Sequence, residues 1–60
     1  AMIFYRQALV IEPRFVEAWH NLGLCYESKR DKAQALQSYS RALKLNPNFE
    51  KSRLAAEALR

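Results

Sequence analysis

Length, composition and charge exclude several classes of protein. Sixty residues make at most one small domain, and a single cysteine excludes an internal disulfide. One histidine and one cysteine cannot build a four-ligand zinc site, and no apolar run approaches the roughly 20 residues that span a bilayer. The net charge is +4, but the basic residues are spread along the chain. We therefore expect a soluble, cytoplasmic protein without cofactors or a membrane segment, stabilised by protein partners.

Helix-favouring residues fill the chain between two prolines and one softer break, which predicts an all-α fold. A proline disfavours helix in the residue before it, so the helices that precede Pro13 and Pro47 end there. In the softer break, "ESKRD", Asp31 can cap the following helix, and Gln34 lies three residues on to complete a capping box. The sequence predicts four helices, at about 1–11, 15–29, 32–45 and 48–59.

The two proline segments repeat one another at a spacing of 34 residues. When "AMIFYRQALVIEPRF" is laid over "ALQSYSRALKLNPNF", six positions are identical. The identical pairs are Ala1 with Ala35, Tyr5 with Tyr39, Ala8 with Ala42, Leu9 with Leu43, Pro13 with Pro47 and Phe15 with Phe49. Fixed self-similarity of this length indicates a helical repeat protein.

Residues 16–49 resemble one complete tetratricopeptide repeat, a 34-residue helix-turn-helix unit with signature residues in a fixed order. Every signature position is filled, by Trp19, Leu22, Gly23, Tyr26, Ala35, Tyr39, Ala42 and Pro47. The resemblance implies a single domain, 1–60, of antiparallel helix hairpins. In it, 1–15 is the second helix of a partial repeat, 16–49 the complete repeat and 50–60 a C-terminal capping helix.

The physical properties of these residues agree with that assignment. Gly23 inside a helix costs about 1 kcal/mol relative to alanine, which is explained if it lets a neighbouring helix backbone approach closely. Arg53 and Glu57 stand where a further unit would carry its tryptophan and glycine, and they can pair on a solvated face. A polar last helix of this kind is typical of the end of a solenoid.

By the same resemblance, the first helix of each unit lines a concave groove that holds a peptide or a partner's helix. The groove positions implied here are Glu17, His20, Asn21, Leu24, Glu27, Ser28, Lys51, Leu54, Ala55 and Ala58. One subfamily grips carboxy-terminal carboxylates of heat-shock chaperones with Lys, Asn and Arg. Asn21 and Lys51 match two of those places, but Ala55 stands where the arginine is expected, which argues against a carboxylate clamp.

A reactive site at Cys25 and His20 is the alternative interpretation of the rare residues in this stretch. The two are five residues apart, about 140° around a helix, so they do not face one another. Glu17 with His20 has spacing compatible with a metal, but such pairs are common on exposed helix faces. We expect Cys25 to fill space as a small apolar side chain, and we expect no enzyme activity.

The first predicted helix is apolar almost all round, although its hairpin partner is not in the sequence. Ile3, Phe4 and Val10 fall opposite Gln37, Ser38 and Lys44 of the complete unit. Either the chain is a piece of a longer array, or a second chain covers this helix, most simply in a two-fold dimer. The predicted self-association residues are Met2, Ile3, Phe4, Tyr5 and Val10.

The sequence thus predicts a non-enzymatic protein-protein interaction module that binds a protein or peptide and self-associates. The alternative is a basic helical module that binds nucleic acid. That alternative needs lysines and arginines gathered on one face, and the ten here occupy several faces and the loops.

Overall fold

Four helices account for most of residues 2–60, which are the residues that the computed structural model describes, and no strand occurs among them. They are α1 (Met2–Ile11), α2 (Val16–Ser28), α3 (Lys32–Leu45) and α4 (Glu50–Leu59). The predicted all-α fold is confirmed, and the helix ends differ from the expected ones by one or two residues at most. The expected start of the first helix at Ala1 lies outside the described residues.

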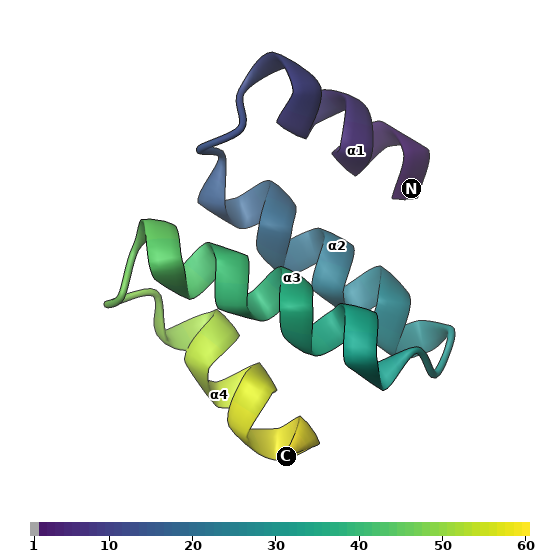
Figure 1. The fold of residues 1–60 in the computed structure, drawn as a ribbon, viewed down its shortest axis with the longest axis vertical. Coiled ribbons are helices and arrows are strands. Elements are labelled where there is room, and N and C mark those ends of the chain that lie inside the picture. Colours follow the sequence, from purple (N-terminus) through teal and green to yellow (C-terminus); the bar gives the residue numbers. More distant parts are fainter. Residues whose placement is uncertain (1) are drawn as a thin grey trace.

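Successive helices run antiparallel and lie side by side in chain order (Figure 1). The central pair, α2 and α3, makes the most extensive contact, and α1 and α4 pack against its two sides. The molecule is flat, with principal extents of 30 × 26 × 14 Å. This stacking leaves one side of α1 and one side of α4 without a neighbouring helix.

The turns that end α1 and α3 have the same geometry, one repeat apart. Phe15 precedes α2 with φ −77° and ψ 91°, and Phe49 precedes α4 with φ −78° and ψ 90°. Before each phenylalanine a side chain accepts a bond from the backbone two residues on: Glu12 from Arg14 at 3.2 Å and Asn46 from Asn48 at 3.1 Å. The repeat seen in the sequence is therefore also a repeat of backbone conformation.

The turn between α2 and α3 forms only half of the predicted capping box. The Asp31 carboxylate accepts the backbone N–H of Gln34 at 3.3 Å, as expected. The Asp31 N–H, however, donates to the Tyr26 carbonyl at 2.9 Å, and the Arg30 N–H donates to the Glu27 carbonyl. These two bonds close α2 with a Schellman motif in which Arg30 has φ 62°, so Asp31 N–H is unavailable to Gln34.

The core consists of two clusters that share Tyr26. Leu9, Ala18 and Leu22 form the cluster between α1 and α2, with Met2, Tyr5, Ala8 and Trp19 packed against it. Ala35, Tyr39 and Ala56 form the cluster between α3 and α4, with Leu36, Ala55 and Leu59 beside it. Three of the repeat's signature residues, Leu22, Ala35 and Tyr39, thus lie in the interior.

Gly23 is buried at the contact between α2 and α3, but its neighbour is a side chain. A β-carbon at this position would lie 2.5–2.9 Å from three ring atoms of Tyr39, closer than real carbon atoms approach. The expectation of a helix backbone at this point was wrong in that detail. The glycine makes room for an aromatic ring, and that ring is fully buried.

Candidate functional site

The signature residues Trp19 and Tyr26 position α2, one of the two helices that carry the candidate site. The Trp19 indole N–H donates to the Pro13 carbonyl at 2.9 Å and so ties α2 to the turn before it. Arg41 of α3 lies over the same indole, 5.6 Å from the ring centroid. The hydroxyl of Tyr26 accepts a bond from Arg6 of α1 at 2.6 Å. Trp19 and Tyr26 therefore join α2 to both of its neighbours.

Most of the predicted groove residues are exposed on α2 and α4. On α2 these are Glu17, Leu24, Glu27 and Ser28, and on α4 they are Lys51, Leu54 and Ala58. Leu24 and Leu54 stand out, since 44% and 56% of their surfaces are exposed although both are large and apolar. We define the α2–α4 face as six exposed residues together with the half-buried Asn21; the exposed residues are Glu17, Leu24, Ser28, Lys51, Leu54 and Ala58.

Ala55 and His20, two further predicted groove residues, contact other parts of the chain. Ala55 packs beside Ala35 and Tyr39 in the core cluster between α3 and α4, so it does not stand free on the surface. His20 is half-buried between α2 and α4, where its Nδ1 forms a 2.9 Å hydrogen bond with the Ser52 hydroxyl. Its ring also lies 5.4 Å from the ring of Tyr39 and 5.6 Å from that of Phe49. His20 therefore holds α4 against α2.

Charged groups of the predicted groove surround this histidine. Burial lowers the pKa of His20 below its ordinary value, and the positive charge of Lys51 lowers it further. Glu17 and Glu27 act in the opposite direction, without overcoming those two effects. The structure thus brings residues from α2 and α4 together around one imidazole, and it favours the neutral form of that imidazole.

Glu27 has a second structural role at the edge of the α2–α4 face. Its Oε1 accepts a hydrogen bond from the Tyr39 hydroxyl at 2.7 Å. Burial, and then this bond to a carboxylate, raise the pKa of Tyr39 well above its ordinary value. Tyr39 can therefore remain fully buried because its only polar atom has a partner at the surface.

Ser52 is a functional neighbour that sequence reasoning missed. It is fully buried and provides the hydroxyl that His20 contacts. Ser52 lies 34 residues after Ala18, and Ala56 lies 34 residues after Leu22. All four residues are buried. Applying the 34-residue spacing to the last helix would therefore have predicted that Ser52 is buried.

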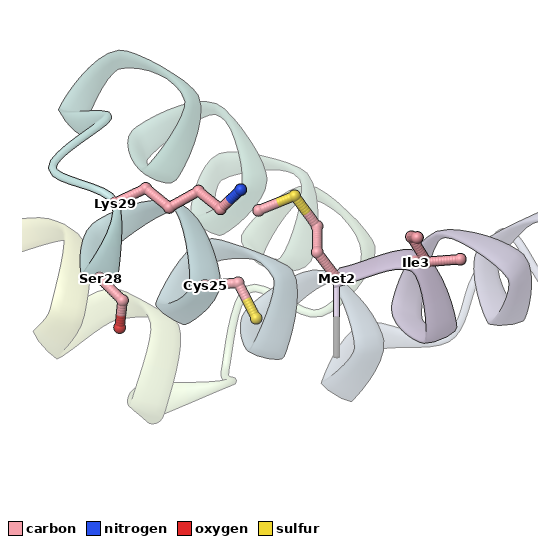
Figure 2. Close-up of a pocket in the computed structure, with 5 residues that line it drawn as sticks. All are labelled: Met2, Ile3, Cys25, Ser28 and Lys29. Carbon is pink, nitrogen blue, oxygen red and sulfur yellow. The ribbon is translucent and has the colours of Figure 1, made fainter.

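An open hollow of about 460 Å³ lies where the start of α1 meets the end of α2 (Figure 2). Met2, Ile3, Cys25, Ser28 and Lys29 line it. It therefore brings two predicted self-association residues close to one predicted groove residue, Ser28. Cys25 is half-buried in the wall of this hollow. His20, its partner in the alternative reactive site, forms a hydrogen bond with Ser52 of α4.

The predicted self-association residues divide into two groups. Met2 and Tyr5 are half-buried and pack against the cluster of Leu9, Ala18 and Leu22 in their own chain. Ile3, Phe4 and Val10 are 73%, 69% and 82% exposed, and Ile11, which the prediction left out, is 85% exposed. The surface of α1 that a second chain could contact therefore excludes most of Met2 and Tyr5 and includes Ile11.

A family model described as "Tetratricopeptide repeat" matches residues 16–49, the helices α2 and α3 together with the turn after them. The chain belongs to the tetratricopeptide repeat family. The match covers the predicted complete repeat and confirms the resemblance on which that prediction rested. Repeats of this family generally mediate protein-protein interaction.

Three curated proteins are similar to this tetratricopeptide repeat chain. It is 34% identical over 93% of its length to "Tetratricopeptide repeat domain-containing protein PYG7, chloroplastic" of Arabidopsis thaliana, and covers 19% of that protein. It is 44% identical over 75% of its length to "Uncharacterized protein ycf37" of Pyropia yezoensis, covering 25%. A "UDP-N-acetylglucosamine--peptide N-acetylglucosaminyltransferase" of Giardia intestinalis is 40% identical over 78% of the chain, which covers 3% of it. The chain thus spans a quarter or less of each relative.

The described residues also bear on metal binding and on membrane insertion. Within residues 2–60, no group of three or more His, Cys, Asp or Glu side chains could hold a metal ion. None of the described helices has the length and apolar character needed to cross a membrane. The cytoplasmic location stays a prediction, and the first relative is described as chloroplastic.

Proposed function

We propose that this tetratricopeptide repeat chain is a non-enzymatic protein-interaction module that binds a peptide or a partner's helix on the α2–α4 face. The observation that carries the proposal is the exposure of Leu24 and Leu54, 44% and 56%, on two helices that the His20–Ser52 bond joins. Exposed leucines held on two folded helices offer apolar contact to a partner without the cost of ordering a flexible segment.

The polar residues of the same face suggest the chemistry of the partner. Asn21 is half-buried beside Leu24, and its amide can both donate to and accept from a peptide backbone. Lys51 provides a positive charge on α4 near Leu54. The face therefore suits a segment that carries apolar side chains and a nearby carboxylate.

The test uses peptides selected from a random library on the wild-type chain, with affinity measured by isothermal titration calorimetry. Leu24→Glu and Leu54→Glu should each weaken binding at least tenfold, because both put a charge into an apolar contact. Both residues are exposed, so circular dichroism should show unchanged helix content.

Gln37→Glu is the matched control, because it adds the same charge at an exposed position on α3. It should bind the selected peptides as the wild type does. Equal affinity of Leu24→Glu, Leu54→Glu and the wild type for those peptides would rule out the α2–α4 face as the binding surface.

Contacts of the arginines favour this function over nucleic-acid binding. Arg6 bonds to Tyr26, Arg41 lies over Trp19, and Arg53 pairs with Glu50 and Glu57. Fewer basic groups are then free to contact phosphates on one face. A titration with duplex DNA at low and moderate salt checks this, since phosphate contacts would give affinity that falls steeply with salt.

Self-association through α1 is the second part of the proposal. It is supported by the exposed apolar side chains of Ile3, Phe4 and Val10, which a monomer leaves in water. A chain of this size gains stability when a partner covers such a surface. Sedimentation over a range of concentrations tests it.

A further inference from the structure

The exposed apolar residues of α1 form an ordered pattern. We call Ile3, Phe4, Val10 and Ile11 the α1 stripe; each of these residues is between 69% and 85% exposed. At about 100° per residue, Ile3 and Val10 lie about 20° apart around the helix, and so do Phe4 and Ile11. The stripe therefore consists of two parallel rows, each with one residue near either end of α1.

Gln7 lies at the centre of this pattern. The stripe residues are three and four positions before Gln7 and three and four positions after it. Around the helix, Gln7 falls midway between the two rows, and its side chain is exposed. No charged residue belongs to the stripe, and Arg6 beside it is turned back to the Tyr26 hydroxyl. The apolar positions are therefore arranged symmetrically about Gln7 along the helix.

We propose that the α1 stripe binds the α1 stripe of a second copy of this chain, antiparallel, with Gln7 on the two-fold axis. This inference rests on the proposed self-association and specifies its geometry. A two-fold axis through Gln7 places each row against the same row of the second copy, so Ile3 would face its Val10 and Phe4 would face its Ile11. An amide on a two-fold axis can donate to and accept from its symmetry mate, so Gln7 remains hydrogen-bonded when the interface excludes water.

The internal repeat argues for a second copy over a helix placed on α1 as α2 is placed on α3. In α3, Ser38 and Leu45 are the equivalents of Phe4 and Ile11, and they are buried and half-buried. Gln37 and Lys44 are the equivalents of Ile3 and Val10, and they remain exposed. A helix in that position would cover only one row of the stripe. An antiparallel copy centred on Gln7 covers both rows.

The surface involved is small, which sets the affinity to be expected. Four side chains and the helix between them bury roughly 1,000 Å² in total over both copies, at the low end of specific interfaces. We therefore expect a dimer with a dissociation constant in the micromolar to millimolar range. Sedimentation velocity and equilibrium from about 10 μM to about 1 mM cover that range.

The decisive experiment changes the residue on the axis. Gln7→Glu and Gln7→Lys each place two like charges face to face, so each variant alone should dimerise at least tenfold more weakly than the wild type. A one-to-one mixture of the two variants should regain dimerisation, because opposite charges then meet on the axis. Circular dichroism of each variant should match the wild type, since Gln7 is exposed and helical in either case.

Gln37→Glu serves as control, because it makes the same chemical change on α3 and should leave dimerisation unchanged. A chain that is monomeric at about 1 mM would overturn both the self-association and this geometry. A dimer that tolerates Gln7→Glu and Gln7→Lys would overturn the geometry and leave the self-association standing. Peptide binding on the α2–α4 face is measured separately and depends on neither result.

Discussion

Gly23 and Tyr39 together set the distance between α2 and α3. The Tyr39 ring occupies the space that any side chain at position 23 would need, and its hydroxyl bonds to Glu27 one turn further along α2. Gly23 thus gives the ring its space, and Glu27 holds the hydroxyl at its end. The absence of a β-carbon is here a requirement of packing.

We expect Gly23→Ala to lower the free energy of unfolding by about 1–2 kcal/mol. Alanine gains about 1 kcal/mol in helix propensity, but overpacking against a buried ring costs about 2–3 kcal/mol. Urea denaturation followed by circular dichroism measures the difference. Ser40→Ala, at an exposed position of α3, should stabilise by a few tenths of a kcal/mol. A Gly23→Ala variant as stable as the wild type would contradict the packing described for Tyr39.

The role of Gly23 was predictable from the sequence, while its contact was not. A lone glycine amid helix-favouring residues signals a steric requirement whatever its neighbour is. Which atoms approach it depends on the rotamer of Tyr39, whose hydroxyl bonds to Glu27, 12 residues away. Spacing alone carries no information on such a bond.

At the scale of the helices, His20 is the polar link between α2 and α4. Its Nδ1 bonds to Ser52, and its ring lies between Tyr39 and Phe49. The positions of Leu24 and Leu54 relative to each other therefore depend on a group whose charge changes with pH, and burial lowers the pKa of that group.

We expect stability to fall as the pH drops from about 7.5 through the ordinary pKa of histidine, about 6.5, and below it. The pKa of His20 is lowered in the folded state by burial and by Lys51, so in this window the unfolded chain binds more protons. The contribution is present above about pH 6.5 and is lost as the pH falls through the folded pKa. Urea midpoints at several pH values measure it.

His20→Asn is the control for this pH dependence, because it keeps a polar group near Ser52 and cannot titrate. Since His20 is the chain's single histidine, the slope of stability between about pH 7.5 and 5.5 should largely disappear in the variant. An unchanged slope would show that another group is responsible.

Hydrophobic periodicity did not predict which side of α1 packs against α2. Its apolar residues surround the axis, so no single face was marked for burial. The structure turns Met2, Tyr5 and Leu9 toward α2 and leaves Ile3 and Val10 in water. The 34-residue repeat does predict it, because the three residues that face α2 are equivalent to Leu36, Tyr39 and Leu43 of α3.

In the molecule as a whole, α1 is the least buried helix. Ala35, Tyr39 and Ala42 on α3 and Ser52 on α4 are fully buried, whereas Leu9 is the one buried residue of α1. The number and order of the helices followed from Pro13, Pro47 and Asp31. The α2–α4 face was predicted only from the family resemblance, because its mixed polar and apolar residues form no pattern that marks a binding site. No sequence pattern showed that Ala55 faces the core.

We expect hydrogen exchange at low protein concentration to show the amides of α2 and α3 as the slowest and those of α1 as the fastest among the helices. Local opening of α1 breaks contacts with a single neighbouring helix, whereas opening of α3 exposes the most deeply buried residues. Mass spectrometry after short proteolysis would resolve the four helices. Equal protection of α1 and α3 in the monomer would contradict this order.

The matching turns at Phe15 and Phe49 have a consequence for enlarging the protein. Because both residues have nearly the same φ and ψ, a second copy of 16–49 inserted after Phe49 would be joined through a Phe–Val bond that the chain already contains. Lengthening the molecule by one unit therefore requires no new linker, and the surface proposed to bind a peptide can be extended with the chain's own sequence.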